Sequence, residues 1–102
     1  MHLKGPIILI EDDEDDRELM QEIFKELAVP NRVLCFEEGT EVLRYLKTTT
    51  DRPFIIITDV NLPGMNGLEL RQAILKDPVL LKKSIPFVFL STSGGQQIME
   101  KV

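Results

Sequence analysis

Four short apolar runs are the feature of this 102-residue chain that most limits its fold. Three of the runs are continuous rather than alternating, which is the pattern of strands that are buried on both faces. Such strands occur in parallel sheets that carry helices on each side. The four runs are Ile7 to Ile10, Arg32 to Phe36, Phe54 to Thr58, and Pro86 to Ser91.

The segments between these runs place apolar residues at helical spacing. Leu19, Ile23 and Leu27, with Met20 and Phe24 beside them, predict a first helix whose stripe lies in the core. Three further helices are predicted around Val42, Leu43 and Leu46, from about Leu68 to Lys76, and from Gly95 to Val102.

Strands and helices therefore alternate along the chain, which predicts an α/β domain with an open, doubly wound parallel sheet between two layers of helices. The third helix must stop near Asp77, because Pro78 disfavours helical geometry in the residue before it. In sheets of this kind the ligand site lies beyond the carboxyl ends of the strands.

The charge of the chain is acidic and unevenly distributed. The formal net charge is -5, and nine of the 17 acidic residues lie between Glu11 and Glu26. This sign disfavours direct binding of nucleic acid. No apolar run approaches the length of a membrane span, and Met1 to Gly5 lacks the layout of a signal peptide. The single cysteine, Cys35, favours a reducing, cytoplasmic setting.

Carboxylates and hydroxyls follow three of the predicted strands. Glu11 and Asp12 follow the first strand, Asp59 follows the third, and Ser91 and Thr92 follow the fourth. Three carboxylates brought to one sheet edge repel one another unless a cation lies between them. Oxygen ligands alone favour Mg²⁺ over a softer metal, and a hydroxyl nearby could bond a phosphate oxygen. The spacing predicts a site for magnesium and phosphate.

The segment from Asp59 to Gly67, with its Pro63 and Gly64, resembles the phosphoacceptor loop of bacterial response-regulator receiver domains, the CheY-like superfamily. The acidic pair after the first strand and Ser91 after the fourth match the same family. These three motifs occur in the expected order, and the resemblance covers essentially the whole chain. It implies the flavodoxin-like variant of the doubly wound fold.

The resemblance also implies a role for each matching residue. Asp59 would accept a phosphoryl group from a sensor histidine kinase or a phosphotransfer protein. Asp12, Asp59 and the backbone carbonyl of Asn61 would bind Mg²⁺, with Glu11 acting through water or as an alternative ligand. Ser91 would bond a phosphoryl oxygen and switch an output surface around the fourth strand and helix, which could also serve a homodimer. The loop would be shaped by Pro63, Gly64 and Gly67.

The sequence departs from the family pattern in two places. It ends at Val102, before the fifth strand with its Lys and the fifth helix. We therefore expect residues 1–102 to form a receiver domain that is incomplete at its C-terminus, with Pro86 to Ser91 as an uncovered sheet edge that more chain or a partner would cover. The second departure is Thr92, where the family usually has Ala or Gly; Thr92 beside the phosphate could slow its loss, or could itself be the switch residue.

Two other functions remain open from the sequence. An aspartyl-phosphate hydrolase of the haloacid dehalogenase type would need an Asp two residues after Asp59 as its general acid, and that residue is Asn61. A receiver-like interaction module that never takes phosphate would be expected to have lost an acidic site residue, and none is lost. We expect a signalling phosphoprotein rather than an enzyme. The acidic run and the long connection from Asp77 to Ile85 are similar to stand-alone receivers, including partners of phytochrome-type kinases.

Overall fold

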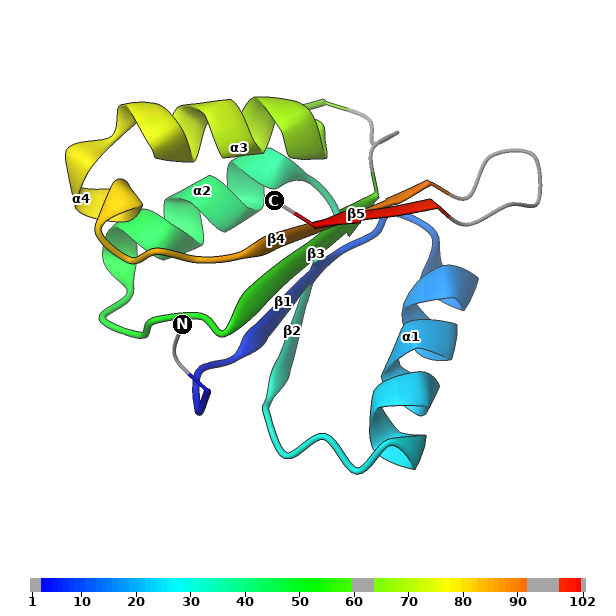
Figure 1. Ribbon diagram of the computed structural model, residues 1–102. Helices are drawn as coiled ribbons and strands as arrows, with labels where there is room; N and C mark the ends of the chain where they lie inside the picture. Colours follow the sequence, from blue (N-terminus) through cyan, green and yellow to red (C-terminus); the bar gives the residue numbers. More distant parts are fainter. Residues whose placement is uncertain (1–2, 60–63, 92–97, 102) are drawn as a thin grey trace.

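The computed structural model describes residues 3–59, 64–91 and 98–101 (Figure 1). Strands and helices alternate along most of the chain, as the apolar runs predicted. The elements are β1 (Ile7–Ile10), α1 (Glu14–Glu26), β2 (Val33–Phe36), α2 (Gly39–Thr48), β3 (Ile55–Asp59), α3 (Gly67–Lys76), α4 (Pro78–Leu81), β4 (Phe87–Ser91) and β5 (Ile98–Lys101). Each of the four predicted strands begins and ends within one residue of its predicted bounds.

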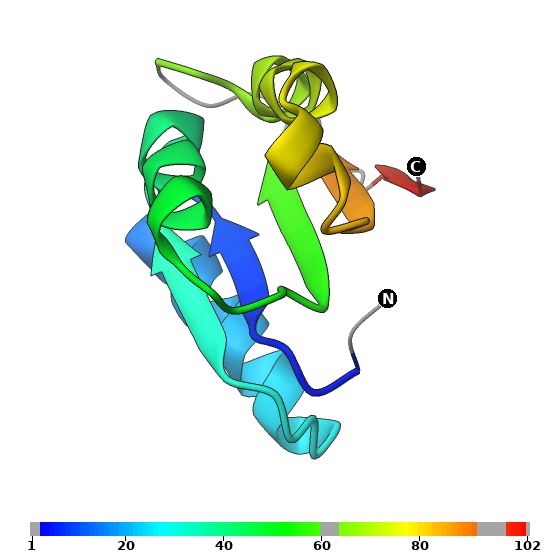
Figure 2. The same cartoon turned by 90° about the vertical axis from the view of Figure 1, so that its left-hand side faces the viewer.

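A single sheet with the strand order β2-β1-β3-β4-β5 forms the centre of the molecule (Figure 2). The first four strands are parallel, and β1 lies between β2 and β3. The order reverses direction at β1, since β2 lies on one side of it and β3 on the other. A parallel sheet with this order is the doubly wound arrangement that the sequence predicted.

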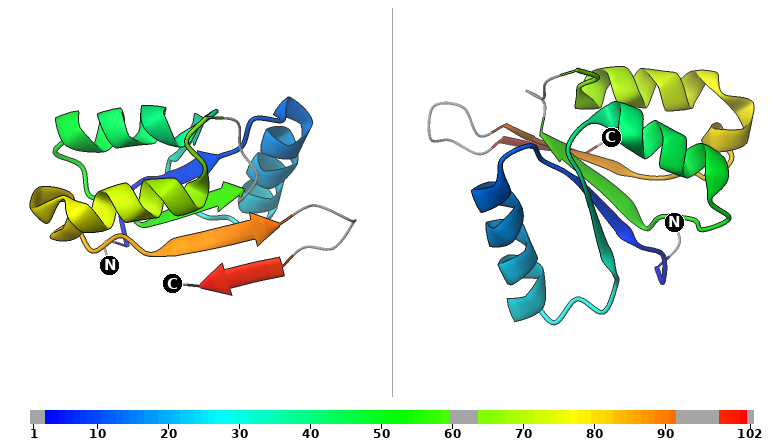
Figure 3. Two further views of the ribbon diagram at one scale, coloured as in Figure 1. Left: turned by 90° about the horizontal axis from the view of Figure 1, so that it is seen from above. Right: turned by 180° about the vertical axis from the view of Figure 1, so that it is seen from behind.

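Helices cover both faces of the sheet (Figures 1 and 3). α2, α3 and α4 lie on one face, where the buried Ile8, Ile10 and Ile56 pack with residues of these helices. α1 lies on the other face, where Met20 and Phe24 pack against a cluster that contains Ile7, Leu9 and Ile57. Successive strand residues therefore point to opposite cores, which is why the runs are continuously apolar.

The stripe of α1 that was predicted as core is instead exposed. Leu19, Ile23 and Leu27 are 50%, 39% and 70% exposed, whereas Met20 and Phe24 are half-buried against the sheet. The two sets lie on neighbouring faces of the same helix, only one position apart in sequence. The predicted helix is confirmed, but the predicted packing face is wrong by about a quarter of a turn.

The C-terminal segment is a strand and not the predicted fourth helix. β5 runs antiparallel to β4, with Leu90 opposite Met99 and Val88 opposite Lys101. Only six residues connect the two strands, and a parallel return would need a crossover of a dozen residues or more. The sheet thus has a fifth strand that we did not predict, and the edge of β4 is covered by it.

The connection from Asp77 to Ile85 contains a short helix, α4, which was not predicted. The Asp77 side chain caps it by accepting hydrogen bonds from the N–H groups of Val79 and Leu80 at 2.9 and 3.3 Å. Leu80 is 1% exposed and belongs to the core beside α2 and α3. In the described part of the chain, no helix is both long and apolar enough to cross a membrane.

Candidate functional site

Two acidic residues meet at the carboxyl edge of the sheet because of strand register. Ile10 of β1 pairs with Thr58 of β3, so the residues that follow, Glu11 and Asp59, stand at the same level on neighbouring strands. Both residues are 6% exposed. Parallel strands bring their carboxyl ends to one edge, so residues nearly 50 positions apart become neighbours, as the sequence predicted.

The pKa of the Glu11 carboxyl is shifted by this position. Its pKa is raised from 4.5 to about 7, chiefly by burial; the neighbouring Asp12, Asp59 and Asp16 add to the rise, and a hydrogen bond from the backbone of Asp13 opposes it. The carboxylates of Asp12 and Asp59 therefore act electrostatically on Glu11 at this edge.

The loop between β1 and α1 is held by its own acidic residues. Asp13 is the N-cap of α1, and its Oδ1 accepts hydrogen bonds from the N–H groups of Asp15 and Asp16 at 2.8 and 3.2 Å. The N–H of Asp13 donates in turn to Glu11 Oε1 at 3.1 Å. Asp13 therefore caps α1, and Glu14, Asp15 and Asp16 form its acidic first turn, where negative charge interacts favourably with the helix dipole.

The loop between β3 and α3 is shaped by two glycines of the predicted motif. Gly64 has φ +67°, a left-handed conformation that side chains disfavour. At Gly67 the limit is space, since a Cβ atom there would lie 2.6 Å from Thr58 Cγ2 and 3.2 Å from Phe89. The predicted loop residues Asn61 and Pro63 lie outside the described residues.

The predicted switch residues are only partly described. Ser91 is the last residue of β4, and because Asp59 pairs with Leu90, the backbone of Ser91 lies one step beyond the level of Asp59. This is the edge at which Glu11 and Asp59 lie. Thr92 lies outside the described residues.

The oxygen atoms of Glu11, Asp12 and Asp59 are the type of ligand that a hard cation such as Mg²⁺ prefers. The neighbouring carboxylates help to raise the pKa of Glu11, and a divalent cation would relieve that repulsion. Within the described ranges, no set of three or more acidic, His or Cys side chains is arranged as ligands around one point. The predicted set differs from such a cluster, because it combines Asp12 and Asp59 with the backbone carbonyl of Asn61, and Asn61 is not described.

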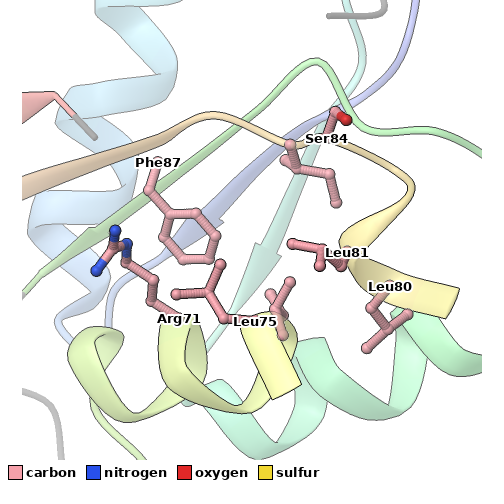
Figure 4. A pocket seen from close by; sticks show the side chains of 8 residues that line it. Arg71, Leu75, Leu80, Leu81, Ser84 and Phe87 are labelled. Atoms are coloured by element: carbon pink, nitrogen blue, oxygen red, sulfur yellow. The ribbon is translucent and has the colours of Figure 1, made fainter. Parts of the chain in front are cut away.

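An apolar pocket lies elsewhere, between α3, α4 and the start of β4 (Figure 4). Its lining includes Leu75, Leu81 and Phe87, with Arg71 and Ser84 as polar neighbours. None of the predicted site residues lines it. The carboxylate edge is therefore distinct from this pocket.

Arg17 also lies at the carboxyl edge of the sheet, and it was not predicted as a site residue. Its Nη1 donates a hydrogen bond to the backbone carbonyl of Glu11 at 2.9 Å, across six positions of sequence. A bond from a side chain to a loop carbonyl has no periodic signature, so only the folded structure reveals it.

The four parallel strands, with buried carboxyl groups where the strand order reverses, define a doubly wound domain with an acidic site at the carboxyl edge of its sheet. The family model described as the response regulator receiver domain matches residues 7–102. The chain belongs to this family.

Curated relatives agree with this assignment. The chain is 33% identical over 95 residues to response regulator Rcp1 of Synechocystis, which covers 88% of this chain and 63% of Rcp1. It is 30% identical over 90 residues to chemotaxis protein CheY1 of Helicobacter pylori strain 26695, covering 88% of this chain and 69% of CheY1. The chain thus spans somewhat less than two thirds of Rcp1.

Solved structures show the same fold. The bacteriophytochrome response regulator AtBRR superposes with a TM-score of 0.78 at 32% identity, covering 88% of this chain and 68% of that one. The phosphorylated cyanobacterial phytochrome response regulator RcpA gives a TM-score of 0.74 at 38% identity, covering 88% and 66%.

Proposed function

We propose that this chain receives a phosphoryl group on Asp59 in a two-component phosphorelay, with a sensor histidine kinase or a phosphotransfer protein as the donor. The observation that carries the proposal is the pair of buried carboxyl groups of Glu11 and Asp59 at the carboxyl edge, with the exposed Asp12 next to Glu11. The membership of the chain in the receiver family supports it.

In the proposed reaction, a carboxylate oxygen of Asp59 attacks the phosphorus atom of a phosphohistidine. A bond forms between that oxygen and phosphorus, the bond between phosphorus and the imidazole nitrogen breaks, and the imidazole leaves with the electron pair. Asp59 holds the phosphoryl group as an acyl phosphate. The product is a mixed anhydride that water later hydrolyses, so the phosphate serves as a signal with a limited lifetime.

Asp12, Asp59 and the carbonyl of Asn61 would hold Mg²⁺, with Glu11 as a ligand through water or an alternative ligand. When bound, Mg²⁺ supplies positive charge that offsets the anionic phosphoryl group at an edge that is already acidic. Asp12 and Glu11 supply acidic side chains beside Asp59, and the burial of Asp59 limits the access of bulk water to its carboxyl group.

Ser91 would donate its hydroxyl to a phosphoryl oxygen and thereby change the surface around β4. Thr92 would lie beside the same phosphate. An output partner or a second copy of the chain would read this surface. We place the protein in the cytoplasm, as a signalling domain that assists its own phosphorylation and dephosphorylation.

A phytochrome-type kinase is the first donor to test. Two of the most similar structures are phytochrome or bacteriophytochrome response regulators, at 32% and 38% identity. The resemblance that the sequence showed to such receivers points to the same class of kinase.

The test is the intact mass of the protein after incubation with acetyl phosphate. We expect one phosphate adduct that requires Mg²⁺ and is absent in Asp59→Asn. Asp51→Asn is the matched control, because Asp51 lies in an exposed ion pair with Arg32. Absence of the adduct from the wild-type protein in Mg²⁺ would favour the interaction module that takes no phosphate.

A further inference from the structure

Arg17 is a cation in direct contact with the loop that carries the acidic pair. Its side chain is 21% exposed, and its Nη1 atom lies 4.0 Å from Oε1 of Glu37, in the segment that follows β2. The same Nη1 atom donates to the carbonyl oxygen of Glu11 at 2.9 Å. Arg17 therefore links the β1–α1 loop to the loop after β2.

The contact fixes one particular peptide group. The carbonyl of Glu11 belongs to the peptide that joins Glu11 to Asp12, so its orientation decides the direction in which Asp12 leaves the strand. The N–H of Glu11 already donates to the carbonyl of Phe36 at 3.0 Å. With Arg17 on the carbonyl, the backbone of Glu11 is held from both sides.

The charge of Arg17 and its hydrogen bond act on a bound cation in opposite directions. The positive charge repels Mg²⁺, but Glu37 and solvent screen it. The hydrogen bond holds the peptide group that joins Glu11 to Asp12, and such supporting contacts strongly affect metal affinity. We propose that Arg17 is a positioning residue for this carboxylate site and that its hydrogen bond outweighs its charge; this inference rests on the proposed function.

The test compares Arg17→Met, which removes the charge and the donor, with Arg17→Lys, which keeps a charge and a donor. Mg²⁺ affinity is measured by NMR titration of ¹⁵N-labelled protein, whose spectra also report folding. We expect Arg17→Met to weaken Mg²⁺ binding by about tenfold and Arg17→Lys to restore part of the loss. The rate of phosphorylation by acetyl phosphate should return to the wild-type value at saturating Mg²⁺.

A purely electrostatic role predicts the opposite sign, because removal of a nearby positive charge tightens the binding of a cation. Tighter or unchanged Mg²⁺ binding by folded Arg17→Met would overturn the proposal. If Arg17→Met does not fold, Arg17→Lys decides the question. Mg²⁺ affinity equal to that of the wild-type protein, with the amide signal of Glu11 at its wild-type chemical shift, would overturn the proposal. Weaker Mg²⁺ binding by Arg17→Lys would support it.

The matched control is Arg32→Met. Arg32 forms an exposed ion pair with Asp51 at 3.1 Å, at the opposite end of β2 from Phe36. Its loss should leave Mg²⁺ affinity unchanged. Failure of the wild-type protein to bind Mg²⁺ or to take phosphate would contradict the proposed function instead, so the two failures are distinguishable.

Discussion

The Glu11 carboxyl makes the site sensitive to pH. Its pKa in the folded state is raised from 4.5 to about 7, so the folded protein holds this proton more tightly than the unfolded chain does. Stability that is present below pH 4.5 is therefore lost as the pH rises toward and through 7.

We predict that unfolding in urea without Mg²⁺ shows this loss between pH 5 and 8, on the order of 2 kcal/mol, and that Glu11→Gln removes most of it. Mg²⁺ affinity of the wild-type protein should rise over the same range, because binding competes with the proton. An equal loss of stability in Glu11→Gln would assign the effect to another group.

The residues of the site divide into those that the sequence could predict and those that it could not. Glu11, Asp12 and Asp59 were predictable, because the end of a parallel strand fixes where its next residue lies. The contact of Arg17 with the Glu11 carbonyl was not, since it depends on a single side-chain conformation. The roles of Asn61, Ser91 and Thr92 stay predictions.

At the scale of the element, α3 can approach β3 closely only because it begins with Gly67. A Cβ atom there would meet Thr58 Cγ2 at 2.6 Å, and Thr58 is fully buried. Gly67→Ala should destabilise the protein by about 1–3 kcal/mol, as overpacking of a core does.

Urea unfolding measures this effect, with Leu68→Ala as the control, because Leu68 is the next residue of α3 and is 51% exposed. Combining Gly67→Ala with Thr58→Ser, which removes Cγ2, should recover part of the loss. A Gly67→Ala variant as stable as wild type would show that the helix shifts at no cost.

The face of α1 gives a second prediction at this scale. Phe24→Ala should cost about 2 kcal/mol in unfolding free energy, because Phe24 packs on the sheet. Leu27→Ala should cost less than about 0.5 kcal/mol, because Leu27 is 70% exposed. A larger loss of unfolding free energy in Leu27→Ala than in Phe24→Ala would mean that the stripe of Leu19, Ile23 and Leu27 faces the core.

Two of the differences between the predicted and observed elements, in α1 and in the C-terminal segment, have physical causes. Both apolar sets of α1 have helical spacing, and a pattern of spacing does not say which set meets the sheet. The few apolar residues of the C-terminal segment, Ile98 and Met99, suit either a short helix or a short strand, and pairing with β4 decides for the strand.

At the scale of the whole molecule, binding at the carboxyl edge should stabilise the fold, because the edge joins β1, β3 and the two loops that follow them. At a Mg²⁺ concentration about 100 times its Kd, linkage adds about 2.7 kcal/mol to the unfolding free energy. We predict this gain for the wild-type protein and a much smaller one for Asp59→Asn, in urea at constant ionic strength. Equal gains in both proteins would place Mg²⁺ elsewhere.

The overall topology was the most predictable property of the chain. Continuous apolar runs separated by helical segments leave few arrangements other than a parallel, doubly wound sheet. The parallel direction of β1 to β4 follows from that pattern, whereas the flavodoxin-like variant of the fold was implied by the family resemblance. The direction of β5 does not follow from the apolar runs, because it depends on a pairing that lies outside the repeating pattern.

The most direct test of the central claim is to identify the phosphorylated residue by chemical trapping. Borohydride reduces an acyl phosphate to an alcohol with loss of phosphate, so a phosphorylated aspartate becomes homoserine. After phosphorylation in Mg²⁺ and trapping, tandem mass spectrometry should find homoserine at position 59 and nowhere else. Homoserine at position 12, or at no position in a protein that carries phosphate, would contradict the account.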